Sequence, residues 1–424
     1  MTAAPSSNDA RREPSPPHFS SLDDARTARA RRENPRRPMG AAYAKLRERR
    51  ARPLDDARCA ELAPVWGPFV DTFVATLHAQ GAAVRANDDA RSTADGGAST
   101  SYRKPGVERL VAIGDVHGDL AKTREAFRAA GLTNEADEWI GGDATCVQVG
   151  DQLDRGKDEV AILHFLERLR GEARDAGGEL IVMNGNHETL NVSGRFRYSL
   201  PEGNADFARW RARQDIGRAL RANCGLAAGA CEARGGEAAK ANVLPNFVKE
   251  SEGDRWRALA PGSPMALRFL AHQPVVVAVG STLFVHGGVL PEHVKYGLDT
   301  LNAEIADWMR RGKVKAAPPL SVQGRDSLVW ARDYSHVQEH KCDCDLLKET
   351  LTMIPGVERV VVGHTIQHPH GITTACDGKV IRVDVGMSKG CVDAKPEVLE
   401  ILRDGEQISK LKLADDGKVE TVSI

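Results

Sequence analysis

The stretch Gly150-Asp151-Gln152-Leu153-Asp154-Arg155-Gly156 follows the apolar run Thr145-Cys146-Val147-Gln148-Val149 and precedes a segment with helical periodicity. The apolar run predicts a buried strand. Two carboxylates and a guanidinium at the end of such a strand can hold cations and an anion side by side. Taken alone, the stretch could equally be a salt-bridged turn capped by glycines, so its neighbours decide between the two interpretations.

Four more polar clusters follow predicted strands. They are Gly114-Asp115-Val116-His117-Gly118-Asp119 after Val107–Ile113, Gly185-Asn186-His187-Glu188 after Leu180–Met183, His286-Gly287-Gly288 after Leu283–Val285, and Gly363-His364-Thr365 after Val360–Val362. Asp115, Asp151 and Asn186 are 36 and 35 residues apart, about one βαβ unit each. Because the carboxyl ends of neighbouring parallel strands open on one crevice, we expect these side chains to meet.

The order of elements predicts an α/β fold. Helices expected at Asp119–Ala130 and Glu159–Ala173 alternate with the first strands, which implies right-handed parallel crossovers. Later strands are expected at Val275–Val279 and Val380–Val385, with hairpin-like glycine turns, so the sheets should be mixed. Between them, residues of about 189–272 form a mostly helical cap insertion.

Composition divides the chain into three parts. Residues 1–58 form an Arg/Ala-rich tail that is expected to be disordered, 59–103 a docking helix (Val65–Leu77) with a linker, and 104–424 the catalytic domain. The tail's basic runs could meet an anionic partner, although a solvated tail is the simpler interpretation. The 424 residues are 41% hydrophobic and 28% charged with a net charge of -1, so no nucleic acid or membrane partner is expected. The expected location is cytoplasmic, with a mitochondrial one as the alternative.

Eight cysteines are too few for a disulfide scaffold. Most of them are therefore expected to be reduced and structural. Cys342 and Cys344 are too close for an easy mutual disulfide, and Cys224 with Cys231 is the pair favoured for redox chemistry.

The polar residues at the strand ends suit two metal ions. Asp115 and His117 can share one ion, and Asp151 can bridge because a carboxylate has two oxygens. Asn186, His286 and His364 can complete the second site. This mixed nitrogen and oxygen set favours divalent or trivalent Mn, Fe or Zn. Two such ions about 4 Å apart lower the pKa of a bridging water and hold the oxygens of an in-line phosphoryl displacement.

The remaining polar residues suit phosphoryl transfer. Arg155 and, as a second clamp, Arg332 after the strand-like Leu328-Val329-Trp330 can bind phosphate, with Asn186 beside them. His187 is placed to protonate the leaving oxygen, and Asp154 can orient its imidazole. Each motif is weak by itself, and their joint occurrence in this order indicates the site.

These motifs resemble the signature of the calcineurin-like metallophosphoesterases, phosphoprotein phosphatase branch. Within it, residues of roughly 64–402 are most similar to the Shewanella-like protein phosphatases, particularly the plant-type, non-plastid subgroup. The specific motifs are Asn186-His187-Glu188-Thr189-Leu190-Asn191-Val192 leading to Phe196-Arg197-Tyr198, Val362-Gly363-His364-Thr365-Ile366-Gln367, and Asp384-Val385-Gly386-Met387-Ser388. Phe69-Val70-Asp71-Thr72-Phe73-Val74 and Lys341-Cys342-Asp343-Cys344 carry the subgroup resemblance.

The resemblance implies a central β-sandwich flanked by helices, a two-metal centre with the same ligands, and a preference for phosphotyrosine in the subgroup. The predicted function is therefore a metal-dependent protein phosphatase that hydrolyses phosphotyrosine, phosphoserine or phosphothreonine with a hydroxide bridging two metals. The alternatives are a dinucleoside polyphosphate or nucleotide phosphohydrolase and, from another class, an inactive scaffold that binds phosphoproteins.

Overall fold

The computed structural model describes residues 101–223, 244–311 and 317–424, which all belong to the compact unit Pro53–Ile424. The predicted tail, the docking helix Val65–Leu77 and the pair Cys224 and Cys231 lie outside the described residues. The division of the chain into tail, linker and cap stays a prediction. Among the described residues, no helix is long and apolar enough to span a membrane.

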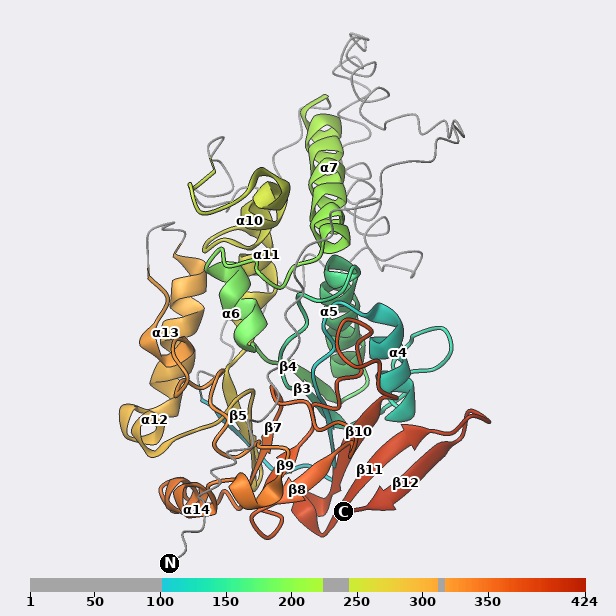
Figure 1. The fold of residues 1–424 in the computed structure, drawn as a ribbon. Coiled ribbons are helices and arrows are strands. Elements are labelled where there is room, and N and C mark those ends of the chain that lie inside the picture. The colour runs from blue at the N-terminus through green and yellow to red at the C-terminus, as the bar shows by residue number, and fades with distance from the viewer. Residues whose placement is uncertain (1–100, 224–243, 312–316) are drawn as a thin grey trace, which may run out of the picture. The chain divides into compact units, whose positions relative to one another are not determined.

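Two six-stranded sheets form the centre of the fold (Figure 1). The first has the order β12-β11-β10-β2-β3-β4, in which β2, β3 and β4 are parallel and β10, β11 and β12 continue antiparallel. Its strands are β2 (Arg109–Ile113), β3 (Thr145–Gln148), β4 (Glu179–Val182), β10 (Glu397–Leu402), β11 (Gln407–Leu413) and β12 (Val419–Ser423).

The second sheet has the order β1-β5-β6-β7-β9-β8. Here β6, β7 and β9 are parallel, while β5 and β8 pair antiparallel with β6 and β9. The strands are β1 (Arg103–Lys104), β5 (Val276–Val279), β6 (Thr282–Val285), β7 (Arg359–Val362), β8 (Thr373–Ala375) and β9 (Val380–Arg382). Both sheets are thus mixed, as predicted.

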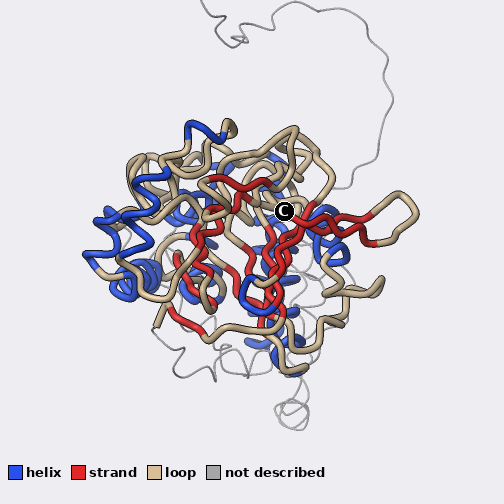
Figure 2. The backbone as a smooth tube through the Cα atoms, turned by 90° about the horizontal axis from the view of Figure 1, so that it is seen from below, coloured by secondary structure: helices blue, strands red, loops and turns tan. Residues whose placement is uncertain are grey.

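The sheets share a hydrophobic core. Val111 and Val147 of the first sheet belong to the same buried cluster as Val277 and Val361 of the second. Alternate residues such as Val276 belong to a second cluster on the outer face, because successive side chains of a strand point to opposite sides. Figure 2 shows the strands through the middle of the unit, with helices outside them. This arrangement confirms the predicted sandwich.

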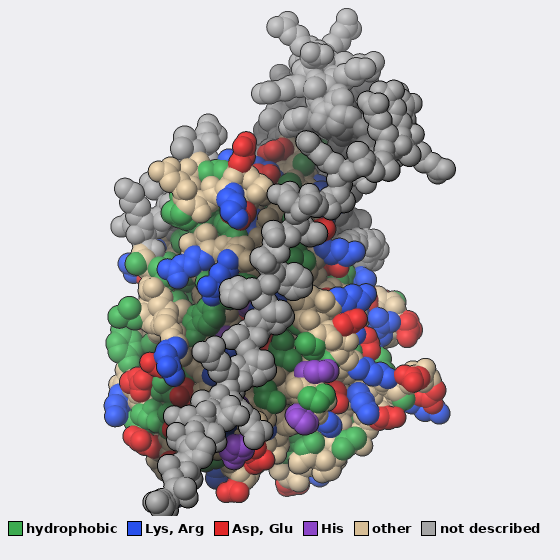
Figure 3. Space-filling view, viewed as in Figure 1, with side chains coloured by type: hydrophobic (Ala, Val, Ile, Leu, Met, Phe, Trp, Pro, Cys, Tyr) green, Lys and Arg blue, Asp and Glu red, His purple; other side chains and the backbone are tan. Residues whose placement is uncertain are grey.

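Helices α4 (Leu120–Ala129) and α5 (Glu159–Asp175) pack on the first sheet through residues such as Phe127 and Phe165. α4 begins where it does because Asp119 caps it: the Asp119 carboxylate accepts the Lys122 N–H at 3.1 Å. Both helices agree with the predicted ones to within two residues. Acidic and basic side chains are interspersed on the face drawn in Figure 3.

Further helices cover the two sheets. The helices between β4 and β5, which are α6, α7, α10 and α11, lie above β3 and β4 in Figure 1. Their bounds, with those of later elements, are α6 (Asn186–Val192), α7 (Pro201–Asn223), η1 (Glu250–Glu252), α10 (Gly253–Leu259), α11 (Pro264–Arg268), η2 (Leu270–His272), α12 (Pro291–Tyr296), α13 (Leu298–Arg310), η3 (Leu320–Val322), η4 (Glu339–Lys341), α14 (Cys344–Thr352) and η5 (Arg403–Gly405).

The structure corrects three predictions about local structure. The strand expected at Val380–Val385 ends at Arg382. Leu328-Val329-Trp330 forms a turn rather than a strand, because the Leu328 carbonyl accepts the N–H groups of Gly287 (2.9 Å) and Gly288 (3.1 Å) instead of a strand partner. Strands β10, β11 and β12 were not predicted at all.

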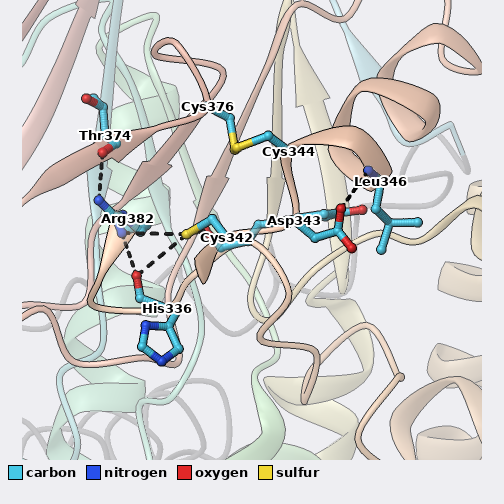
Figure 4. The surroundings of a disulfide bond; sticks show 9 residues. His336, Cys342, Asp343, Cys344, Leu346, Thr374, Cys376 and Arg382 are labelled. Carbon is cyan, nitrogen blue, oxygen red and sulfur yellow. Dashed lines mark hydrogen bonds between the residues drawn. A yellow bond between two sulfur atoms is a disulfide. The ribbon is translucent and has the colours of Figure 1, made fainter. Parts of the chain in front are cut away.

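The cysteine prediction is also wrong in part. Cys344 at the start of α14 forms a disulfide with Cys376, which directly follows β8 (Figure 4). The two residues are 32 apart in sequence, and only the packing of α14 beside β8 brings them together. Of the other described cysteines, Cys146, Cys342 and Cys391 are free. The Cys342 thiol lies 3.2 Å from the Tyr334 carbonyl, to which it can donate.

Candidate active site

The predicted metal ligands lie at the carboxyl ends of five strands, β2, β3 and β4 in one sheet and β6 and β7 in the other. The polar clusters predicted from the sequence thus meet across the two sheets. All the predicted metal ligands are buried: Asp115, His117, Asp151, Asn186, His286 and His364. His187 and Asp154 are buried with them.

Asp151 lies at the centre of this cluster. Its Oδ2 is 3.2 Å from His286 Nε2, 3.7 Å from His117 Nε2 and 3.8 Å from His187 Nε2. Among the described residues, two sets of donor atoms lie close enough to hold an ion, with all atoms of a set within 4.8 Å of one another. One set is His117, Asp151 and His187, and the other is Asp151, His286 and His364. Asp151 belongs to both, as a bridging ligand must.

Asp115 and Asn186 flank these sets. Asp115 Oδ2 is 3.9 Å from His117 Nε2 and accepts the backbone N–H of His364 at 3.2 Å. Asn186 Oδ1 is 2.9 Å from His286 Nε2. Asp115 therefore faces the first set while touching the strand end that carries His364, and Asn186 joins the second set.

Hydrogen bonds orient the imidazoles toward this centre. His117 Nδ1 lies 3.1 Å from the Leu153 carbonyl, and His286 Nδ1 lies 2.9 Å from the Val149 carbonyl. Because a carbonyl only accepts, each Nδ1 carries the proton, and each Nε2 faces the centre. His364 Nε2 is buried without a hydrogen-bond partner in the described part of the chain, which is unusual for an imidazole nitrogen.

The electrostatics of the centre also suit cations. Burial lowers the pKa of His117 to about 3 and that of His364 well below its usual value, so both imidazoles are neutral, the form that ligates metals. Burial and then the Asp384 carboxylate raise the pKa of Asp115 well above its usual value. Burial raises the pKa of Asp384 itself to about 6. Buried carboxylates this close repel one another, and bound cations would relieve that repulsion.

Five residues of the site have positive φ angles, which side-chain-bearing residues rarely adopt. They are His117 (41°), Asp151 (56°), Asp154 (66°), Arg155 (60°) and His364 (67°). Such conformations persist only where the surroundings enforce them. Here Gly118 and Gly156 allow the two turns to touch: a Cβ added to Gly156 would lie 2.3 Å from the Gly118 carbonyl oxygen.

Glu188 holds the central turn in place. Its buried carboxylate accepts the N–H groups of Asp151 (2.8 Å), Gln152 (2.9 Å), Leu153 (3.1 Å) and Gly185 (2.7 Å). One side chain thus ties the end of β3 to the start of α6. Glu188 is part of the motif Asn186-His187-Glu188, but the sequence pattern predicts no role for it.

A buried ionic network stands behind His187. His187 Nδ1 is 2.7 Å from Asp154 Oδ2, and Asp154 Oδ1 accepts from Arg255 Nη2 at 2.8 Å. Arg255, on α10, is 0% exposed and also donates to both Glu159 oxygens and to Asn191 Oδ1. Burial alone would lower the pKa of His187, but the carboxylates of Asp151 and Asp154 outweigh it and raise that pKa. His187 is therefore suited to carry a proton.

Arg255 and Glu159 were missed by the sequence analysis. Arg255 lies 101 residues beyond Asp154, in the segment expected to form the cap, and no local pattern connects the two. Asp384 was quoted only within a motif, because the predicted strand was thought to include it. Its burial beside Asp115 appears only when β9 is placed next to β7.

The two predicted phosphate-binding arginines lie on different sides of the cluster. Arg155 donates its backbone N–H to the Tyr198 carbonyl at 3.0 Å, and its Cζ is 5.0 Å from the Tyr198 ring centre. Its buried Nε has no hydrogen-bond partner among the described residues. Arg332 is exposed and donates to the His364 carbonyl (3.1 Å) and to Thr365 Oγ1 (2.6 Å). The structure thus brings both arginines to the site.

Comparison with known proteins agrees with this geometry. The family model described as calcineurin-like phosphoesterase matches residues 108–368. Shewanella-like protein phosphatase 2 of Arabidopsis thaliana is 43% identical over 349 residues, which cover 82% of this chain and 87% of the relative. Shewanella-like protein phosphatase 1 of Plasmodium berghei is 25% identical, over 66% of this chain and 67% of the relative.

Solved structures show the same fold. The crystal structure of a cold-active protein tyrosine phosphatase from a psychrophilic Shewanella species superimposes with a TM-score of 0.53 at 21% identity, over 76% of this chain and 82% of that one. The two packed sheets, the buried donor sets and these matches together assign the chain to a family. The chain belongs to the calcineurin-like phosphoesterases and, within them, to the Shewanella-like protein phosphatases.

Proposed function

We propose that this phosphoesterase is a metal-dependent protein phosphatase that hydrolyses phosphomonoesters on protein side chains. The observation that carries the proposal is the pair of donor sets sharing Asp151, with the His187–Asp154 pair on one side and Arg155 and Arg332 at the rim. The relatives named protein phosphatases support a protein substrate, and the solved tyrosine phosphatases of the same fold support phosphotyrosine among the target residues.

In this proposal Asp115, His117 and Asp151 hold one metal, and Asn186, His286 and His364 hold the second with Asp151 shared. The neutral imidazoles of His117 and His364, the unpartnered His364 Nε2 and the crowded carboxylates support this assignment. The mixed donor set favours Mn, Fe or Zn. When bound, two such ions would supply Lewis acidity toward the phosphoryl oxygens and would lower the pKa of an attacking water.

The chain's own side chains perform the remaining steps. Arg155 and Arg332 bind the phosphoryl oxygens, and Asn186 contributes a further polar contact. His187 donates the proton on Nε2 to the leaving oxygen as the phosphorus–oxygen bond breaks. Asp154 keeps the imidazole oriented through Nδ1 and stabilises its protonated form, with Arg255 fixing the other carboxylate oxygen.

Substrate class is tested by kinetics on three substrates. The purified chain is given a phosphotyrosine peptide, a phosphoserine peptide and a dinucleoside polyphosphate, with Mn²⁺ added or chelated. The proposal predicts peptide turnover that chelation abolishes and metal restores. Rapid cleavage of the dinucleotide without turnover of either peptide would instead indicate a nucleotide hydrolase, and no turnover of any substrate would indicate a binding scaffold.

The role of His187 needs its own test, because its Nε2 also lies within reach of Asp151 and His117. His187→Asn should retain the metal content of the wild-type protein, measured by elemental analysis. It should also lose far more rate on an alkyl phosphate than on an activated aryl phosphate, whose leaving group needs no proton. Loss of metal together with an equal loss of rate on both substrates would make His187 a ligand instead. Asp151→Asn is the matched comparison, since a shared ligand should lose both metal and activity.

A further inference from the structure

Arg332 is held at the rim of the site by one end of its guanidinium. Its Nη1 donates to the His364 carbonyl at 3.1 Å and to Thr365 Oγ1 at 2.6 Å. In the part of the chain that the structure describes, Nε and Nη2 have no hydrogen-bond partner. Nε and Nη2 form one planar edge of the guanidinium, so this edge can donate to two oxygens of a phosphoryl group at once. The two contacts of Nη1 therefore decide where the free edge points.

Thr365 is in turn held by a second hydroxyl. Its Oγ1 lies 2.6 Å from Ser335 Oγ, and Ser335 is 0% exposed. One of the two hydroxyls donates to the other, and the Thr365 oxygen keeps a lone pair for the guanidinium of Arg332. Arg332 and Ser335 lie on one loop and Thr365 lies on another. The pair of hydroxyls thus connects the two loops at the point where the guanidinium is bound.

Other contacts hold the two loops together without these hydroxyls. The buried Gln367 donates through Nε2 to the carbonyls of Ser335 (2.9 Å) and Thr365 (2.8 Å). Its backbone N–H donates to the Asp384 carbonyl at 2.8 Å. Removal of the Thr365 hydroxyl should therefore leave the loops in place and release one of the two contacts that hold Arg332.

The charges around Arg332 explain why it needs to be held. Partial burial lowers the pKa of Arg332, and the carboxylates of Asp115 and Asp384 oppose that shift, so the guanidinium lies within reach of their attraction. A free arginine can turn toward such carboxylates, and its donors are then occupied. Both acceptors of Nη1, the carbonyl of His364 and the hydroxyl of Thr365, are neutral. They fix the cation without cancelling the charge that a phosphoryl group requires.

We propose that Thr365 is a positioning residue for phosphoryl binding. Its hydroxyl, oriented by Ser335, fixes Arg332 so that the edge formed by Nε and Nη2 faces the phosphoryl oxygens. This inference rests on the proposed function, because it requires Arg332 to bind the phosphoryl group. Thr365 acts only through Arg332 in this role. Restraining the arginine before the substrate arrives reduces the side-chain entropy that is lost on binding.

The test measures the dissociation constant of inorganic phosphate by calorimetry, with Mn²⁺ present, and kcat/KM for an aryl phosphate. Thr365→Val removes the hydroxyl and keeps a branched side chain, and Thr365→Ser restores the hydroxyl. Thr373→Val is the matched control, because it removes a threonine hydroxyl that is bonded to Gln367 Oε1 at 3.2 Å instead of to Arg332. Arg332→Ala and its combination with Thr365→Val complete a double-mutant cycle.

Thr365→Val should weaken phosphate binding and lower kcat/KM by about threefold to tenfold, as expected when a charged group loses one of two hydrogen bonds. Thr365→Ser should return both quantities to near the wild-type values, and Thr373→Val should keep them. Arg332→Ala should lose more than Thr365→Val. In the Arg332→Ala background, Thr365→Val should have no further effect, because the side chain through which it acts is gone. Metal content, measured by elemental analysis, should be the same in all variants.

Two outcomes would overturn the inference and leave the proposed function intact. One is wild-type phosphate binding in Thr365→Val beside weakened binding in Arg332→Ala. The other is an equal loss from Thr365→Val with and without Arg332, since Thr365 would then act by another route.

Three further outcomes would also count against the inference. An equal loss in Thr373→Val would assign the effect to loosening of the loops, and loss of metal in Thr365→Val would assign it to the neighbouring His364. Unchanged phosphate binding in Arg332→Ala would remove this arginine from the proposed function and the inference with it.

Discussion

Replacing Arg255 by methionine should destabilise the fold strongly, because it leaves the buried Glu159 carboxylate without a cation and leaves Asp154 with His187 alone. Asp154 and Glu159 are both 0% exposed, and Arg255 is the arginine that contacts both. Methionine has a similar length and no charge, so packing around the side chain is largely kept. Breaking a buried ion pair by removing one partner costs about 3–5 kcal/mol.

This cost can be measured as a shift of the thermal unfolding midpoint. For a domain of a few hundred residues, 1 kcal/mol corresponds to about 2–4 °C, so Arg255→Met should unfold roughly 6–20 °C below the wild-type protein. Arg257→Met is the matched control on the same helix. Among the described residues, Arg257 forms an ion pair with Asp254 at 3.2 Å in which both side chains are partly exposed, and such pairs contribute about 0–1 kcal/mol.

A second substitution tests the electrostatic cause. Adding Glu159→Gln to Arg255→Met removes the uncompensated charge of Glu159 and should restore part of the lost stability. Arg255→Met unfolding within 2 °C of Arg257→Met would refute the reasoning. So would a double variant that is less stable than the single one, because the loss would then come from packing rather than charge.

Three other changes test separate features. Cys344→Ser removes the disulfide to Cys376, which closes a loop of 32 residues. The free energy of unfolding, measured by urea titration, should fall by about 3–4 kcal/mol. An unchanged urea midpoint under oxidising conditions would contradict this expectation. Gly156→Ala places a Cβ 2.3 Å from the Gly118 oxygen and should abolish activity while lowering the unfolding temperature, whereas full activity would show that the two turns can separate. Burial, and then the charges of Arg268 and Arg213, hold the pKa of His164 well below its usual value near 6.5. As the pH falls below 6.5, the imidazole is therefore protonated in the unfolded chain but stays neutral in the folded one. Stability should therefore fall with decreasing pH by up to about 1.4 kcal/mol per unit from this residue, and His164→Leu should flatten that slope relative to the wild-type protein.

Much of the fold and of the candidate site could be predicted from sequence because its signals are local. Asp115, Asp151 and Asn186 each follow a short apolar strand, and each strand is followed by a helix of ordinary pattern. The βαβ connection has one strongly preferred hand, so the two successive units from β2 to β4 must place their polar ends together. The same reasoning placed His286 and His364 at the ends of β6 and β7, where the structure has them.

The second sheet's edges and the C-terminal strands carried weaker signals. Residues of β12 are exposed and those of β11 are mostly half-buried, so the pairing of these strands depends on β10 lying beside β2. Likewise, Leu328 was predicted to be part of a strand because it is apolar. Its carbonyl instead accepts hydrogen bonds from the loop residues Gly287 and Gly288. Whether such a segment forms a strand depends on hydrogen-bond partners that are distant in sequence. Hydrophobic periodicity gives no information about those partners.

The sequence by itself determined the succession of β2, β3 and β4 and the turn from Gly150 to Gly156, since each depends on neighbours within one βαβ unit. Only the tertiary structure decided which side chains support that turn. Arg255 reaches Asp154 from α10, Cys376 reaches Cys344 from the end of β8, and Thr365 reaches Arg332 from the loop after β7. These contacts join segments that are far apart in the sequence, so no local sequence pattern predicts them. They form only when the packed sheets and helices bring the segments together.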